Sequence, residues 1–266
     1  MSRTIVLAGN PNVGKSVIFN KLTGSYAVVS NYPGTTVDVS RGMMNHAGEQ
    51  YQVIDTPGTN SLIPGSEDEQ VTRDVLLREN PSVVVQVADT KNLNRALVLT
   101  LEIIELGLPM LLVLNMSDEA RSRGIKTDAA MLSRILGIPV VETVGTTGEG
   151  LSELKRKVDS AAAGNDLVSC PGDINTLLKK ITAEIPQKTP FRGVLAKMLV
   201  SGDESAGAYL PEDIRQKVAA RVKTEPGGFI KPFLRIIASN PADQAGISFP
   251  DPQPGGAVQY IAPGDV

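Results

Sequence analysis

Eight residues near the amino terminus have the types and the spacing of a phosphate-binding loop. Residues 9–16 read Gly-Asn-Pro-Asn-Val-Gly-Lys-Ser, the complete pattern G-x-x-x-x-G-K-[ST]. Apolar residues fill 4–8 and recur at helical spacing after Lys15, so the loop should join a strand to the start of a helix. Backbone N–H groups at a helix start bind phosphate, Lys15 can neutralise the terminal phosphates, and Ser16 can ligate Mg²⁺. The pattern predicts a nucleoside triphosphate site.

Two later motifs supply groups for the metal ion and the base. The tetrapeptide Asp-Thr-Pro-Gly at 55–58 follows an apolar strand at 51–54, and offers a carboxylate to Mg²⁺ and a glycine N–H to the γ-phosphate. Asn-Met-Ser-Asp at 115–118 follows another apolar strand at 111–114. The carboxylate of Asp118 can accept from both N1–H and the 2-amino group of guanine, whereas adenine lacks these donors. We therefore expect the base to be guanine.

The composition is that of an ordinary globular protein. The chain has 266 residues, 41% hydrophobic and 21% charged, and can bury a sizeable core in one or two domains. Its net charge of −3 argues against a dedicated nucleic-acid binder. Cys170 has no partner for an intramolecular disulfide and no metal-ligand spacing with His46, so we expect no zinc site. There is no signal peptide, and the longest apolar stretch, at 108–114, is too short to cross a bilayer, so we expect a soluble chain.

Strands and helices alternate as far as residue 160, which predicts an α/β fold with a doubly wound, mostly parallel sheet. Thr127 or Asp128 can cap one of the helices, and Gly137 ends it. Ligands of such sheets bind beyond the carboxyl ends of the strands, where the three motifs fall. The other expected helices are 69–78, 94–106, 127–136 and 151–161, and the other expected strands are 83–88, 110–114 and 139–143.

The pattern changes after Asp173, where only helical periodicity remains. This predicts a small all-helical domain with helices at 173–185, 191–200, 211–223 and 229–238. The Pro- and Gly-rich end reads as a linker or tail. The expected organisation is a GTP-binding domain at 1–165, a helical domain at 171–248 and the linker or tail at 249–266.

Six strings of residues, spread over nearly the whole chain, carry a family resemblance. They lie at 9–16, 31–38, 55–62, 81–95, 115–120 and 192–203. Together they resemble the cytoplasmic amino-terminal region of the ferrous iron transport protein B family. The resemblance implies a GTPase domain and a helical regulatory domain, which in the family precede a polytopic region that carries Fe²⁺ across the bacterial inner membrane. The implied partners are guanine nucleotide and that membrane region, with no nucleic acid, and self-association is left open.

The resemblance also assigns roles to individual residues. The switch I threonine falls on Thr36, with Thr35 as the alternative, and the implied Mg²⁺ ligands are Ser16, Thr36 and Asp55. Gly58 makes the switch II contact with the γ-phosphate. The base is read by Asn115 and Asp118. The residues expected to contact the nucleotide are Gly9, Asn10, Asn12, Val13, Gly14, Lys15, Ser16, Val17, Thr36, Asp55, Gly58, Asn115, Met116, Asp118, Val144, Gly145 and Thr146.

Catalysis requires an unusual arrangement because the common water-positioning glutamine is missing. Thr59 follows Gly58, and no glutamine occurs before Gln70. Related GTPases with asparagine at the position of Asn12 use it to help hold K⁺, which would neutralise charge as an arginine finger does. The alternative is that Asn12 only caps the loop. We expect slow, K⁺-stimulated hydrolysis, with catalytic roles for Asn12, Lys15, Thr36 and Gly58.

Two further segments affect the site. The loop that should face guanine O6 is usually Ser-Ala-x but is Val-Gly-Thr at 144–146, so only backbone N–H groups remain and we expect weaker binding with unchanged base choice. The acidic run at 67–69 reads as a solvated helix start, and no metal site is expected beyond Mg²⁺ and K⁺.

Two rival functions stay open. A GTPase of ribosome assembly or tRNA modification would share the phosphate loop, but residues 171–266 are not markedly basic and hold no aromatic-rich RNA platform. A nucleotide-binding regulator with negligible hydrolysis also fits, because the glutamine is absent.

Overall fold

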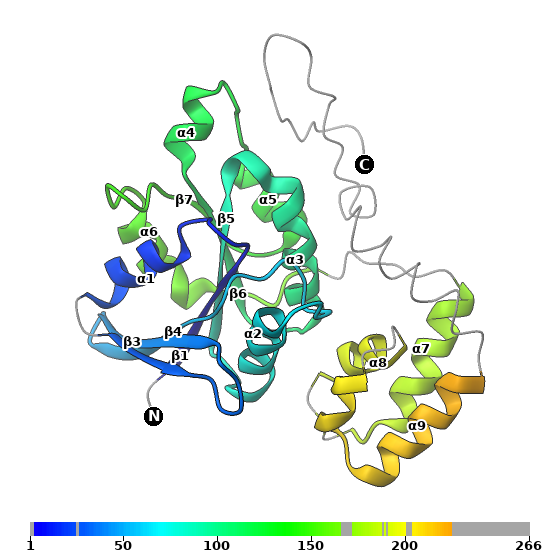
Figure 1. Cartoon of the computed structure of the whole chain (residues 1–266). Coiled ribbons are helices and arrows are strands. Elements are labelled where there is room, and N and C mark those ends of the chain that lie inside the picture. The colour runs from blue at the N-terminus through cyan, green and yellow to red at the C-terminus, as the bar shows by residue number, and fades with distance from the viewer. Residues whose placement is uncertain are drawn as a thin grey trace.

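A seven-stranded sheet forms the centre of the molecule (Figure 1). The computed structural model describes residues 3–24, 27–165, 172–187, 189, 191–200 and 204–224. Its strands are β1 (Arg3–Gly9), β2 (Ala27–Asn31), β3 (Asp38–His46), β4 (Glu49–Asp55), β5 (Val83–Asp89), β6 (Met110–Asn115) and β7 (Val140–Glu142). Its α-helices are α1 (Lys15–Thr23), α2 (Glu67–Arg78), α3 (Leu93–Glu105), α4 (Ser117–Ser122), α5 (Ala129–Leu136), α6 (Leu151–Lys157), α7 (Gly172–Glu184), α8 (Arg192–Val200) and α9 (Glu212–Thr224).

The strand order is β2-β3-β4-β1-β5-β6-β7. The pairs among β4, β1, β5, β6 and β7 are parallel, whereas β3 is antiparallel to β4, and β2 to β3. The central strands β1, β5 and β6 are nearly continuous runs of buried residues, as parallel strands covered on both faces must be. The expected doubly wound, mostly parallel sheet is confirmed.

Helices cover both faces of this sheet. Alternate residues of β1 point to opposite sides, so Ile5 and Leu7 pack with Phe19 of α1 and with α6, while Val6 and Ala8 pack on the other side. Figure 1 shows α1 and α6 on one face and α2, α3 and α5 on the other. The sheet thereby holds the carboxyl ends of five parallel strands along one edge.

Local signals explain several element boundaries. Asp128 caps α5 by accepting from the backbone N–H of Met131 at 2.8 Å, and Gly137 ends the helix with φ of 70°. The expected helix at 151–161 is shorter, because α6 ends at Lys157 and a 3₁₀ turn, η2 (Val158–Ser160), follows. The sequence pattern did not predict β2, β3 or the short α4.

The second part of the described chain is helical, as expected. It contains α7, α8 and α9 and a 3₁₀ segment, η3 (Glu204–Tyr209), which was not predicted. Leu177, Leu178 and Ile181 of α7 are buried, so the apolar spacing gives the packed face. The expected helix at 229–238 and the tail at 249–266 lie outside the described residues.

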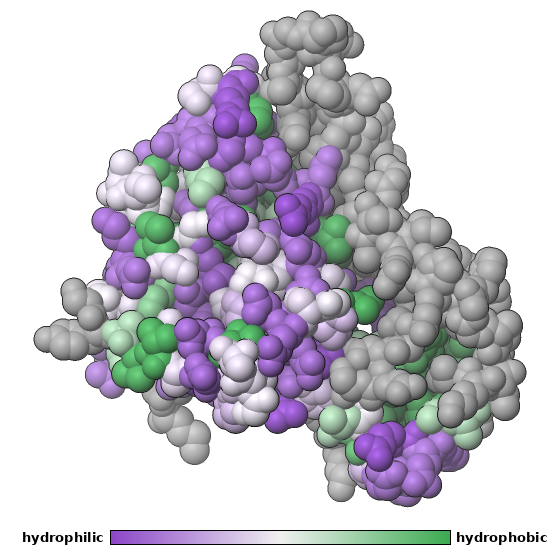
Figure 2. Space-filling view, in the orientation of Figure 1, coloured by the Kyte–Doolittle hydropathy of each residue, from purple (hydrophilic) through white to green (hydrophobic). Residues whose placement is uncertain are grey.

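The surface carries little apolar area in the view of Figure 2, where hydrophilic residues predominate over the sheet domain. Exposed large apolar side chains include Val28 and Val29 on the edge strand β2. Among the described residues, no helix combines the length and the hydropathy needed to cross a membrane.

Candidate nucleotide-binding site

A cavity of about 360 Å³ lies where the phosphate loop leaves β1. The loop reaches it from the carboxyl end of a central strand, the position at which α/β sheets bind ligands. Sequence patterns did not single out two of its lining residues, Pro11 and Asp68, and they assigned the acidic run around Asp68 to a solvated helix start. The cavity is lined by Asn10, Pro11, Asn12, Gly14, Lys15, Ser16, Val17, Gly58 and Asp68.

The charged residues of the first two motifs converge beside this cavity. The Nζ of Lys15 lies 2.6 Å from Oδ1 of Asp55, and the Oγ of Ser16 donates to Oδ2 of Asp55 at 2.8 Å. Lys15 also donates to the backbone carbonyl of Thr56. Lys15 and Asp55 are both buried, so their charges act in a medium that screens them weakly. Hydroxyl and carboxylate oxygens this close together fit a hard cation such as Mg²⁺.

Two glycines allow the loops to approach each other. Gly14 has φ of 82°, and a Cβ there would lie 2.4 Å from the Nδ2 of Asn115. A Cβ on Gly58 would lie 2.9 Å from the Cα of Pro11. The Asp-Thr-Pro-Gly motif therefore packs directly on the phosphate loop, and the close contact requires glycine.

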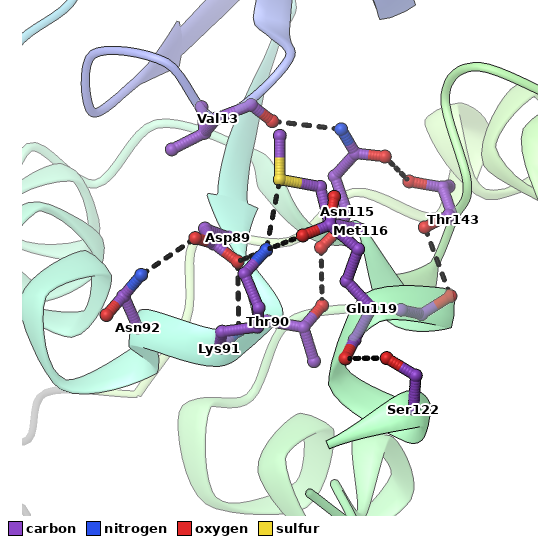
Figure 3. Close-up of polar contacts among 11 residues, drawn as sticks. Val13, Asp89, Thr90, Lys91, Asn92, Asn115, Met116, Glu119, Ser122 and Thr143 are labelled. Carbon is purple, nitrogen blue, oxygen red and sulfur yellow. Dashed lines mark hydrogen bonds and ion pairs between the residues drawn. The ribbon is translucent and has the colours of Figure 1, made fainter.

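Asn115 joins three loops of the site (Figure 3). Its Nδ2 donates to the carbonyl of Val13 at 2.9 Å, and its Oδ1 accepts from Thr143 Oγ1 at 3.0 Å and from the N–H of Gly145 at 2.9 Å. The residue is buried, whereas Asp118 is exposed on the first turn of α4. Of the two residues expected to read the base, Asn115 is a brace and Asp118 is the exposed carboxylate.

Lys91 supports the same motif and was not predicted. Its Nζ lies 3.0 Å from carboxylate oxygens of both Asp89 and Glu119 and 3.4 Å from the sulfur of Met116 (Figure 3). Burial acts to lower the pKa of Lys91, but the hydrogen bonds from the two carboxylates outweigh it, and the pKa is raised. Thr90 donates to the carbonyl of Asn115 at 2.6 Å. Residues after β5 thus fix the motif that follows β6.

The threonines of the 31–38 segment differ in their contacts. Thr35 donates to the carbonyl of Tyr32 at 2.9 Å and accepts from the N–H of Val37 at 3.2 Å, which closes a local turn. Thr36 is exposed, with its hydroxyl 3.4 Å from Glu67. Neither threonine lines the cavity, and the assignment of Thr36 as a Mg²⁺ ligand stays a prediction.

Asn12 lies at the mouth of the cavity in a left-handed conformation, with φ of 64°. Asparagine tolerates this conformation better than most residues. Its side chain is exposed and makes no hydrogen bond within the part of the chain that the structure describes. The capping alternative therefore has no contact in its favour here.

Comparisons with known proteins agree on one family. The family model described as ferrous iron transport protein B matches residues 3–158. The Fe(2+) transport protein A/Fe(2+) transporter FeoB fusion protein of Porphyromonas gingivalis is 39% identical over 221 residues, which are 78% of this chain and 26% of that protein. The Fe(2+) transporter FeoB of Escherichia coli K12 is 36% identical over 219 residues, 79% of this chain and 28% of that protein. The chain thus spans about a quarter of the length of these curated relatives.

Solved structures match most of this chain. A GDP-bound variant of the Streptococcus-type "S. thermophilus" FeoB G-domain aligns with a TM-score of 0.76 and 28% identity, covering 89% of this chain and 95% of that one. The cytosolic domain of T. maritima FeoB in its apo form aligns with a TM-score of 0.72 and 32% identity, covering 88% and 98%.

Proposed function

Because this chain belongs to the ferrous iron transport protein B family and has the GTPase fold of its G-domains, we propose that it binds GTP and hydrolyses it to GDP and phosphate. The convergence of Lys15, Ser16 and Asp55 beside the loop cavity carries the proposal. One cation and two oxygen donors there match the needs of a triphosphate and its metal ion.

Each motif has a distinct task in this reaction. Lys15 and the N–H groups at the start of α1 bind the phosphates, and the N–H of Gly58 meets the γ-phosphate. Ser16, Thr36 and Asp55 would hold Mg²⁺, which when bound draws charge from the phosphate oxygens. Asp118 accepts hydrogen bonds from N1 and N2 of guanine. Backbone N–H groups of 144–146 face O6, so nucleotide affinity is modest.

Charge stabilisation near the γ-phosphate comes from Asn12. The carboxamide oxygen of Asn12 at the cavity would help hold K⁺, and a monovalent cation there offsets the charge that develops on the phosphates. Hydrolysis is then slow and faster in K⁺ than in Na⁺.

We further propose a place for this chain in a larger protein. The curated relatives are Fe(2+) transporters, and the T. maritima structure is of a cytosolic domain. GTP hydrolysis would act as a switch for Fe²⁺ uptake by a membrane region, with this chain at the cytoplasmic face of the bacterial inner membrane. The family match speaks against a GTPase of ribosome assembly or tRNA modification.

The test is steady-state phosphate release from GTP, with ATP as the competing substrate, in matched K⁺ and Na⁺ buffers. The wild-type chain is compared with Asn12→Ala and with the control Asn45→Ala, an exposed asparagine on β3. We expect GTP-selective turnover that rises in K⁺, and loss of that rise only in Asn12→Ala. Equal rates in both buffers would rule out cation activation. Absence of turnover would leave a nucleotide-binding regulator.

A further inference from the structure

Glu102 of α3 holds the loop that follows Gly58. Its Oε1 accepts from the hydroxyl of Ser61 at 2.7 Å, and its Oε2 accepts from the backbone N–H of Leu62 at 2.6 Å. Both carboxylate oxygens therefore bind one short stretch of loop, about 40 residues away in sequence. Hydrogen bonds to an ionised carboxylate are among the stronger ones in proteins.

The same stretch is bonded to the phosphate loop on its other side. The hydroxyl of Thr59 donates to the carbonyl of Ser61 at 2.8 Å, and the N–H of Thr59 donates to the carbonyl of Gly9 at 2.9 Å. Gly58 itself lies against Pro11. The position of the Gly58 N–H is thus fixed between the phosphate loop and the carboxylate of Glu102.

The charges around Glu102 are mainly negative. Glu69 of α2 faces it and accepts from the N–H groups of Asn60 at 3.2 Å and Gly65 at 2.8 Å. Glu105, one turn further along α3, is paired with Lys197 of α8. Burial, opposed by the hydrogen bonds from Leu62 and Ser61 and reinforced by Glu105 and Glu69, raises the pKa of Glu102 to about 7.

The two protonation states hold the loop differently. The ionised carboxylate accepts both hydrogen bonds, whereas the protonated acid has one oxygen that carries a hydrogen and is a poorer acceptor. Near neutral pH the strength with which Ser61 and Leu62 are held therefore changes.

We propose that Glu102 is a positioning residue for GTP hydrolysis, whose ionised carboxylate holds Ser61 and Leu62 so that the Gly58 N–H meets the γ-phosphate. The inference rests on the proposed function. Glu102 acts through the loop and does not line the cavity.

The test measures kcat and KM for GTP between about pH 6 and about pH 8.5, together with the binding of a fluorescent GDP analogue. Wild type is compared with Glu102→Gln, with the conservative Glu102→Asp, and with the control Glu153→Gln, an exposed residue of α6. We expect the wild-type kcat to rise with a midpoint near the pKa of about 7. Glu102→Gln should lower kcat about tenfold at the alkaline end, flatten the profile and leave KM and GDP affinity within about twofold. Glu102→Asp should keep part of the rise.

Several results would overturn the inference. A wild-type pH profile in Glu102→Gln would show that the carboxylate does not set the rate. A parallel fall of kcat, GDP affinity and melting temperature in both Glu102 variants would show a role in folding only. Turnover by the wild type with either result leaves the proposed function intact, whereas no wild-type turnover at any pH would overturn both.

Discussion

Asn115 and Asp118 lie three residues apart and have opposite environments. Asn115 is buried because its amide joins the phosphate loop to the loop after β7, and Asp118 is exposed because α4 turns it away from that contact. The geometry separates the residue that shapes the base site from the residue that contacts the base. A motif of four residues cannot reveal this division, because the partners of Asn115 lie up to 102 positions away.

The base preference can be tested by exchanging one acceptor for a donor. Asp118→Asn places an amino group where guanine presents N1–H and its 2-amino group, so we expect GTP affinity to fall at least about tenfold. Xanthosine triphosphate, which has a carbonyl at position 2, should bind the variant better than GTP. Competition against a fluorescent GDP analogue measures both constants, and Glu119→Gln is the neighbouring control. Unchanged GTP preference would mean that another residue reads the base.

The carboxyl of Glu102 also predicts a pH dependence of stability. Its folded pKa of about 7 lies above the ordinary value of 4.5, so the folded state binds the proton more tightly than the unfolded state. The resulting stabilisation is complete below about pH 4.5 and is lost as the pH rises through about 7. Between about pH 5 and about pH 8, the free energy of unfolding of the wild type should fall by about 2 kcal/mol relative to Glu102→Gln.

Urea titrations of both proteins at several pH values measure this difference. A constant difference across the range would mean that Glu102 has the same proton affinity in the folded and unfolded chain.

Among the elements, those with a strong apolar pattern were predictable from sequence and the exposed ones were not. The strand before the phosphate loop, α3 and α5 follow the expected ranges within one or two residues, because each has a buried face. All residues of β2 are exposed, so no alternation marks it. The acidic start of α2 illustrates another limit, since only the fold brings Asp68 to the cavity.

The contact between the two phosphate-facing loops can be tested at the position that requires glycine. Gly58→Ala forces apart the 55–58 motif and the backbone of Pro11, so the N–H at 58 loses its place. We expect kcat for GTP to fall at least about tenfold while GDP affinity stays within about threefold. The matched control is Gly193→Ala in α8, where an added Cβ meets nothing within 4 Å. Equal kcat values in the two variants would contradict the prediction.

Across the whole molecule, α2 and α3 lie between the nucleotide site and the helical part. The hydroxyl of Tyr209 in η3 donates to Asp74 of α2, and its ring lies 5.4 Å from the guanidinium carbon of Arg78. Lys197 of α8 pairs with Glu105 of α3. These links join residues about 90 to 135 positions apart, which explains why sequence motifs did not predict them.

Removing one of these links should loosen the helical part. Burial and the hydrogen bond to Asp74 raise the pKa of Tyr209, so its hydroxyl stays protonated and donates throughout the neutral range. Tyr209→Phe keeps the ring and removes the donor, and we expect the free energy of unfolding to fall by about 1 kcal/mol. Chemical denaturation measures the loss, with Tyr51→Phe as the control for a hydroxyl bond inside the sheet domain. A change smaller than about 0.3 kcal/mol would show that the bond adds nothing to stability.

The contact of Gly58 with Pro11 also bears on how such a site can evolve. Two positions 47 residues apart share a space too small for one additional methyl group, so the effect of a substitution at one depends on the shape of the other. Their mutational effects should be epistatic, and a library that varies both positions together would reveal functional combinations that single substitutions cannot.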